Sequence, residues 1–320
     1  MIDRPFRACA GMLATAAFAL GTFAAPASAD QFINVLTGGT SGVYYPLGAA
    51  LAKIYSDNIP GVKTQVQSTK ASVENINLIA RGRGEIGFAL GDSVKAAADG
   101  DKEAGFPQKV EKLRAIAAIY PNYVQIVASK ASGVTDLAGL KGKALSVGAP
   151  ASGTELNARA IFKAAGMSYD DLGKTEYLPF AESVELIKNR QLDATLQSAG
   201  LGVASIRDLA SSQPIQVVAV PAEIAEKLGA PFQAAEIPAG TYEGQDAAVP
   251  TLAITNILVT SSDVPDEIAY QMTKQLFEHL DVLKAAHNAG KAIDPKTAAK
   301  NLPVPLHPGA ERYYKEAGLL

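Results

Sequence analysis

Cysteine, tryptophan and histidine are scarce in this chain of 320 residues, which has one cysteine, three histidines and no tryptophan. The single cysteine, Cys9, lies in the N-terminal segment, so a mature chain without that segment has no thiol for a disulfide, a nucleophile or a metal ligand. The histidines are His279, His287 and His307, and none has a carboxylate or histidine at metal-ligand spacing on an evident site loop. We therefore expect no metal site.

The N-terminus has the pattern of a secretory signal peptide. Arg4 and Arg7 form a basic start, residues 8–25 are uncharged and rich in Ala, Leu and Phe, and residues 26–29 read Pro-Ala-Ser-Ala. This order predicts export and cleavage after Ala29. A membrane anchor is the alternative, but an Ala-rich run of this length is marginal for spanning a bilayer.

The composition of the mature chain, residues 30–320, is that of an ordinary globular protein. Loss of the signal peptide removes Asp3, Arg4 and Arg7, so the formal net charge changes from −3 to −4. A mildly acidic exported protein is not expected to bind nucleic acid. No later segment is long and apolar enough to predict a membrane span. The length suits two lobes of ordinary domain size.

Two similar loops suggest an internal repeat. Residues 38–42 (Gly-Gly-Thr-Ser-Gly) and 151–154 (Ala-Ser-Gly-Thr) each follow an apolar run and precede a helical pattern. A Ser-Val-Glu triplet begins 30 residues after the final glycine of each loop, at 72–74 and 183–185, so both copies are offset by 111 residues. A strand, a small-residue loop and a helix start make an anion-receptive site. Two such units predict two similar lobes with a cleft between them.

Alternating strands and helices predict an α/β fold with largely parallel sheets flanked by helices. We expect strands at 32–36, 62–67, 86–90, 113–120, 123–129, 144–147, 175–178, 194–197, 215–220 and 254–260. Helices are expected at 46–54, 72–79, 152–166 and 182–189 and from 265 onward, with Ser72 as one cap and Ser152 with Glu155 as a capping box. The Gly- and Pro-rich stretch 231–250 predicts a long surface loop.

The predicted lobes share a discontinuous organisation. We assign 1–29 to the signal peptide, 30–122 plus 255–320 to lobe 1, and 123–254 to lobe 2. The crossings between lobes are expected near 120–123 and 249–256.

The loop chemistry favours holding a ligand over transforming one. Residues 38–42 lack both the Lys-Ser/Thr ending of a phosphate-binding loop and the full dinucleotide fingerprint, and no Gly-x-Ser-x-Gly elbow occurs. We expect no cofactor and no enzymatic activity. Glycines would let the backbone approach the ligand, and N–H groups at the helix starts would favour a carboxylate. The alternative is a tight turn that needs glycine for backbone reasons alone.

The candidate ligand-binding residues are hydroxyl, amide, glycine, tyrosine and lysine positions in these loops and at strand ends. They are Thr37, Gly39, Thr40, Ser41, Tyr44, Tyr45, Ser68, Lys70, Ser72 and Asn75 in the first half, and Ser152, Gly153, Thr154 and Gln197 in the second. In open α/β sheets, ligands bind beyond the carboxyl ends of strands, where these loops are expected.

Four segments carry a resemblance to a known family. They are 37–48 (Thr-Gly-Gly-Thr-Ser-Gly-Val-Tyr-Tyr-Pro-Leu-Gly), 72–75 (Ser-Val-Glu-Asn), 148–154 (Gly-Ala-Pro-Ala-Ser-Gly-Thr) and 306–316 (Leu-His-Pro-Gly-Ala-Glu-Arg-Tyr-Tyr-Lys-Glu). In this order, over essentially the whole mature chain, they resemble the TAXI-type solute receptors of tripartite ATP-independent periplasmic (TRAP) transporters.

The resemblance implies a two-lobed periplasmic binding protein, type II-like, that closes on its ligand in the cleft. It implies a periplasmic location, a glutamate-like amino acid or small dicarboxylate as ligand, and delivery to TRAP membrane subunits. A monomer is expected for a receptor that closes. Lys70 is less typical of the family, and it either pairs with a second ligand carboxylate or lies solvated on the loop rim.

Three other functions stay open. The chain can be the binding protein of an ATP-driven importer, an exported two-lobed enzyme, or a ligand sensor that docks on a receptor domain. Neighbouring genes would distinguish an ATP-driven importer from a TRAP transporter, and turnover of a bound ligand would identify an enzyme.

Overall fold

Alternating strands and helices make up the part of the chain that the computed structural model describes, residues 1–2 and 31–320. The strands are β1 (Gln31–Leu36), β2 (Val62–Gln67), β3 (Ile86–Leu90), β4 (Leu113–Ser129), β5 (Ala144–Ser146), β6 (Lys174–Glu176), β7 (Ala194–Ala199), β8 (Ile215–Val218), β9 (Gln233–Ile237) and β10 (Val249–Ser261). The helices are α1 (Tyr44–Asn58), α2 (Ser72–Ala80), α3 (Gly91–Asp99), α4 (Gly153–Ala164), α5 (Phe180–Lys188), α6 (Ala204–Ser212), α7 (Ala222–Leu228), α8 (Asp266–Glu278), α9 (Leu280–Ala286) and α10 (Pro308–Glu316). Short 3₁₀ helices cover Lys130–Ser132, Ala138–Leu140, Tyr169–Asp171 and Asn288–Ala292.

The strand order of the sheet shows the internal repeat. Within residues 31–320 the strands run β2-β1-β3-β10-β4-β7-β5-β6, with β8 paired to β4 and β9 to β10. In one half, β1 is parallel to β2 and β3, and β10 is antiparallel to β3. In the other half, β5 is parallel to β6 and β7, and β4 is antiparallel to β7. The second half therefore repeats the first in mirror order along the sheet.

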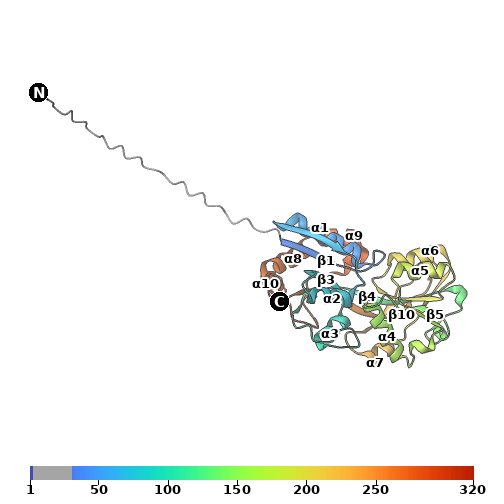
Figure 1. Ribbon diagram of the computed structural model, residues 1–320. Helices are drawn as coiled ribbons and strands as arrows, with labels where there is room; N and C mark the ends of the chain where they lie inside the picture. Colours follow the sequence, from blue (N-terminus) through green and yellow to red (C-terminus); the bar gives the residue numbers. More distant parts are fainter. Residues whose placement is uncertain (3–30) are drawn as a thin grey trace.

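These halves are two lobes, and the predicted two-lobed α/β fold is confirmed. Lobe 1 contains β1, β2 and β3 with α1–α3 and α8–α10, and lobe 2 contains β5, β6 and β7 with α4–α7. Figure 1 shows the lobes side by side, with β4 and β10 between them. The lobe boundaries at 122/123 and 254/255 stay a prediction.

Strands β4 and β10 connect the lobes. The C-terminal end of β10 pairs with β3 and its N-terminal end with β9, while β4 continues past β10 to pair with β7. The prediction of two separate strands around Pro121-Asn122 was wrong, because β4 is continuous through them. A register shift in β10 between Thr255 and Ile257 lies opposite this point, and such bulges accommodate a proline without an N–H donor.

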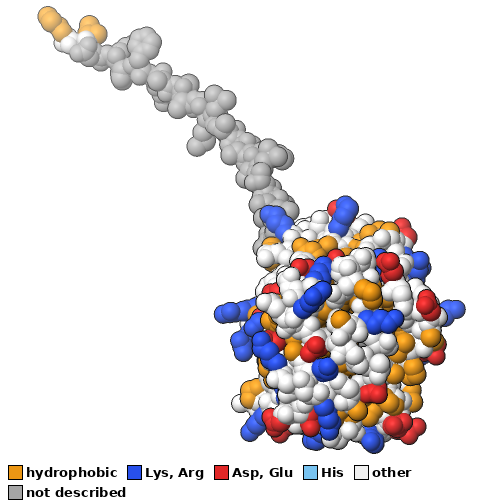
Figure 2. Space-filling view, turned by 90° about the vertical axis from the view of Figure 1, so that its right-hand side faces the viewer, with side chains coloured by type: hydrophobic (Ala, Val, Ile, Leu, Met, Phe, Trp, Pro, Cys, Tyr) orange, Lys and Arg blue, Asp and Glu red, His pale blue; other side chains and the backbone are white. Residues whose placement is uncertain are grey.

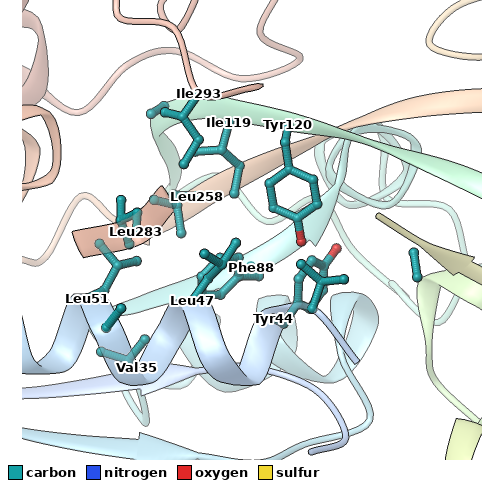
Figure 3. Close-up of a cluster of buried hydrophobic side chains, with 14 of the residues drawn as sticks. Val35, Tyr44, Leu47, Leu51, Phe88, Ile119, Tyr120, Leu258, Leu283 and Ile293 are labelled. Carbon is teal, nitrogen blue, oxygen red and sulfur yellow. The ribbon is translucent and has the colours of Figure 1, made fainter. Parts of the chain in front are cut away.

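The apolar face of α1 packs on the lobe 1 sheet as its sequence spacing predicts. Leu47 and Leu51 are each 1% exposed, and Figure 3 shows them in one cluster with Phe88 of β3 and Leu258 of β10. Residues four apart on a helix share a face, so this pair buries one continuous stripe. The cluster fixes the start of α1 against the strands that cross between lobes.

One of the two predicted helix caps is wrong, and the other lacks its reciprocal hydrogen bond. Ser72 is the first residue inside α2 rather than its cap, and its Oγ instead accepts a hydrogen bond of 3.1 Å from the backbone N–H of Leu90. Ser152 does cap α4, because its Oγ accepts from the N–H of Glu155 at 3.1 Å. The Glu155 carboxylate, however, binds Arg159 at 2.6 Å, so the predicted reciprocal box is only half formed.

The stretch 231–250 is not the structureless loop that its composition suggests. It contains β9 and the first two residues of β10, which pair with each other as an antiparallel ribbon. The short helices α3, α6 and α7, each of at most nine residues, were also not predicted.

The surface carries charges of both signs. On the face shown in Figure 2, Lys and Arg side chains are interspersed with Asp and Glu. Among the described residues, no helix has both the length and the apolar character needed to cross a bilayer. The predicted cleavage site after Ala29 lies outside the described residues.

Candidate ligand-binding site

A cavity of about 310 Å³ lies between the two lobes. Lobe 1 contributes the loops that precede α1 and α2, and lobe 2 contributes the loops that precede α4 and α5. Strand β4 adds Tyr120 and Asn122, where it passes from one lobe to the other. The cavity therefore touches both lobes and the connection between them.

Four helices begin at this cavity. The cap residues of α1, α2, α4 and α5 all line it, namely Val43, Ala71, Ser152 and Pro179. The first N–H groups of a helix have no partner within the helix, and the helix dipole places partial positive charge there. The sequence predicts two such starts, and the structure brings together four. This arrangement favours an anionic group in the cavity.

Ten of the predicted site residues lie in the cavity lining. They are Gly39, Thr40, Ser41, Tyr44, Ser68, Lys70, Ser72, Ser152, Gly153 and Thr154. The two repeated loops thus face each other across the cavity. Ligand contact by each of these residues stays a prediction.

Four predicted residues lie outside the lining. Asn75 is buried behind the first loop, where its Nδ2 donates to the carbonyl oxygens of Thr37 at 2.6 Å and Phe88 at 2.9 Å. Thr37 itself donates to the carbonyl of Gln67 at 2.8 Å. Gln197 accepts from Ser205 at 2.7 Å. Tyr45 lies half-buried on α1. The side chains of Asn75 and Thr37 therefore stabilise the shape of the first loop from behind the cavity.

Two residues of β4 line the cavity but were not among the predicted site residues. Tyr120 and Asn122 line the cavity, but they follow an apolar run that reads as ordinary core strand. Phe180 of α5 also reaches the cavity. Pro121 is the sequence feature that could have indicated Tyr120 and Asn122, because a proline within a strand marks an irregular position.

A buried hydrogen-bond network joins lobe 1, the crossing strands and lobe 2 beneath the cavity. The hydroxyl of Tyr44 donates to Oδ1 of Asn256. Asn256 Nδ2 donates to the carbonyl of Tyr120 at 2.9 Å and to Oδ1 of Asn122 at 2.7 Å. Asn122 Nδ2 in turn donates to the carbonyl of Ser198 at 2.9 Å. Burial raises the pKa of both tyrosines, so both hydroxyls stay neutral.

The network continues back into lobe 1. Ser198 Oγ donates to Oδ1 of Asn157 at 2.7 Å, and Asn157 Nδ2 donates to Oδ2 of Asp92 at 2.6 Å. Burial raises the pKa of Asp92 to about 7, although the amide of Asn157 opposes the shift. Asn157 belongs to α4 and Asp92 to α3, so this bond crosses between lobes.

The lobes are in contact at the helix starts. The N–H of Glu74 donates to the carbonyl of Ala151 at 3.2 Å across the interface. A Cβ placed on Gly153 would lie 2.6 Å from Ser72 Oγ, which is closer than real Cβ atoms approach such an atom. The structure is therefore a closed arrangement in which α2 and α4 meet end to end.

Two side chains of opposite charge line the cavity. Among the described residues these are Lys70 and Glu182, and both are exposed. The structure also shows no cluster of three or more His, Cys, Asp or Glu side chains suited to a metal ion within the described ranges. The deeper lining is neutral, and its hydroxyl groups and helix starts supply the hydrogen-bond donors.

The two-lobed sheet and the cavity between lobes define the periplasmic-binding-protein fold. The chain belongs to the NMT1-like family, whose profile matches residues 35–318.

Solved structures share this fold at low sequence identity. The periplasmic binding protein BugD is 14% identical with a TM-score of 0.57, and the match covers 91% of this chain and 98% of BugD. A protein from Bordetella bronchiseptica RB50 is 14% identical with a TM-score of 0.53, covering 90% and 98% of the two chains. A binding protein component of an ABC phosphonate transporter from Pseudomonas aeruginosa is 12% identical with a TM-score of 0.52, covering 82% and 80%.

Proposed function

We propose that this protein is an extracytoplasmic solute-binding protein that encloses a small acid between its lobes and delivers it to a membrane transporter. The observation that carries the proposal is the meeting of four helix starts at one cavity between two contacting lobes. A volume of about 310 Å³ lies at the small end of the range for small-molecule sites. The solute class is a small carboxylate or an amino acid.

Lobe closure is the mechanism that this geometry supports. The solute contacts both lobes only when they are closed, so it binds the closed state better and shifts the population toward it. The two strands between the lobes, β4 and β10, are the elements around which the lobes would rotate. The closed surface formed by both lobes would then be recognised by the membrane components.

Two kinds of membrane partner fit the proposal, and different observations favour each. One neighbour of the same fold is named as a component of an ABC transporter, which favours an ATP-driven importer. The four sequence segments that resemble TAXI-type receptors favour a TRAP transporter, and in that case an ion gradient drives uptake. Both kinds of receptor share this fold, and the named neighbour gives the ATP-driven importer the stronger support.

Native mass spectrometry of freshly purified protein tests the binding function. We expect a small acid to copurify, and thermal shift with C4–C6 acids and amino acids should raise the melting temperature for that class. Recovery of a chemically altered compound after long incubation would instead indicate an enzyme. No copurified compound and no thermal shift with any solute would contradict the proposal.

Transport in proteoliposomes distinguishes the two partners. Uptake by the membrane proteins encoded beside this gene should require ATP if the partner is an ATP-driven importer, and an ion gradient if it is a TRAP transporter. The mass of the protein recovered from the periplasmic fraction should correspond to residues 30–320 if the predicted signal peptide is removed.

A further inference from the structure

The hydroxyl of Tyr120 is buried at the cavity without a hydrogen-bond partner among the described residues. The side chain is 1% exposed and belongs to β4, where this strand crosses between lobes. Figure 3 shows the hydroxyl at the end of the cluster where Tyr44 also presents its hydroxyl. A buried hydroxyl without a partner costs free energy, so its position in a ligand cavity calls for an acceptor.

The surrounding network leaves Tyr120 as an available donor. The proton of Tyr44 is committed to Oδ1 of Asn256, and Asn256 uses its amide on the Tyr120 carbonyl and on Asn122. These bonds fix the ring of Tyr44 and the backbone of Tyr120. Tyr120 therefore lines the cavity from a rigid support, and its hydroxyl is buried in the cavity wall without a partner among the described residues.

Five backbone acceptors of the cavity lining are already engaged within the protein. The carbonyl oxygens of Gly38, Tyr120, Pro179, Ser198 and Ala199 accept hydrogen bonds from Ser68, Asn256, Ser183, Asn122 and Gln125, respectively. The one carboxylate of the described lining, Glu182, is exposed. The hydroxyl groups of the deeper lining can donate or accept, but no carboxylate of the described lining lies there to pair with a cation, which disfavours an ammonium group.

We propose that the Tyr120 hydroxyl donates a hydrogen bond to a second oxygen of the solute, while its carboxylate lies at the helix starts. This inference rests on the proposed solute-binding function and narrows it. The solute class is an oxo, hydroxy or dicarboxylic acid, and an α-amino acid is the disfavoured ligand. Tyr120 is a specificity-determining residue of the site.

A pair of matched variants tests this role. Tyr120→Phe removes the cavity hydroxyl, and Tyr55→Phe removes another fully buried hydroxyl that also lacks a partner in the described chain but lies on α1 outside the cavity lining. Titration calorimetry would use 2-oxoglutarate, 2-hydroxyglutarate and glutarate, with pentanoate and glutamate as comparisons. Both variants should fold as well as the wild type, because each loses an unsatisfied buried group.

We expect at least one of the three acids with a second oxygen to bind more tightly than pentanoate and glutamate. Tyr120→Phe should lower the affinity for that acid by about tenfold or more, and Tyr55→Phe should leave the affinity within about twofold of the wild-type value. An unchanged affinity in Tyr120→Phe, tighter binding of glutamate, or binding of none of the three acids would overturn the inference. Absence of binding by any solute, copurified compounds included, would instead be the failure of the binding function itself.

Discussion

The side-chain amide of Asn157 donates a 2.6 Å hydrogen bond to the carboxylate of Asp92, and the two residues belong to different lobes. Oδ1 of the same carboxylate is buried without a partner in the described structure. Asn157 has no freedom to turn its amide around, because its Oδ1 accepts from Ser198. The contact therefore places a buried carboxyl group in the interface between the lobes.

The contribution of Asp92 to the stability of the protein should fall as the pH rises from about 4 to about 7. The pKa of Asp92 is about 7 in the folded protein against 3.8 for a free side chain. In that window the folded protein keeps a proton that the unfolded chain has lost, so raising the pH favours unfolding. Asp92→Asn has no carboxyl group to titrate at this position. The melting temperature of the variant minus that of the wild type should therefore increase as the pH rises. Parallel curves for the two proteins would contradict the raised pKa.

Gly153→Ala should impair closure. The added Cβ would meet Ser72 Oγ at 2.6 Å and Cδ1 of Leu90 at 2.7 Å, both in lobe 1. Such overpacking costs about 1–3 kcal/mol in a closed interface, which corresponds to a loss of affinity of about five- to 150-fold. Small-angle scattering with saturating solute should show a larger radius of gyration than for the wild type.

Gly139→Ala is the control, since the nearest neighbour of the added Cβ would be Asp136 Oδ1 at 3.4 Å. Equal effects of both substitutions would refute the closure argument.

The sequence predicts well what depends on local spacing. The two loops at 38–42 and 151–154 and the helices after them follow from small residues, apolar periodicity and a repeated Ser-Val-Glu triplet. The lobes themselves follow from this repeat, and the fold bears them out. Ligand chemistry and membrane partner depend on the cavity and on other proteins, so they stay proposals.

The sequence does not predict the features that depend on pairing between distant segments. Pro121 indicates a strand break when only its neighbours are considered, yet pairing with Thr255 carries β4 through it. Tyr120 and Asn122 reach the cavity only because of that pairing. The strand β9 is similar, because its composition is weakly strand-like and β10 supplies the partner.

The two charged lining residues should change solute affinity in opposite directions. Lys70→Ala should weaken binding of an acid by about two- to fivefold, and Glu182→Gln should strengthen it by a similar factor. Both side chains are exposed, so salt should reduce both effects. Titration calorimetry at low and high ionic strength measures them. A loss far beyond this range for Lys70→Ala that persists in high salt would mean that Lys70 binds the solute directly.

Asn256→Ala should destabilise the protein without any solute present. The substitution removes the partner of the Tyr44 hydroxyl and of Asn122 Oδ1, and all three side chains are buried. Each orphaned group costs about 1–3 kcal/mol, so we expect a loss of about 3 kcal/mol in the free energy of unfolding, measured by urea denaturation.

Asn77→Ala is the matched control for this prediction. The Asn77 amide is only partly buried and donates to the carbonyl of Val73 in its own helix at 3.0 Å. Its removal should cost less than about 1 kcal/mol. A similar loss in both variants would show that Asn256 has no special role in the network.

The mirror order of the strands also determines when the sheet of lobe 1 can be completed during synthesis of the chain. Leu90 of β3 pairs with Asn256 of β10, so the edge of β3 stays open while all of lobe 2 is synthesised. Open strand edges and late pairing between distant segments slow folding. Lobe 2 receives its fourth strand from β4, which precedes β5, β6 and β7 in the chain, and it needs only the start of β10, which pairs with β9. A polypeptide released before β10 emerges would therefore contain a lobe 2 that lacks only the partner of β9 and a lobe 1 that lacks its fourth strand.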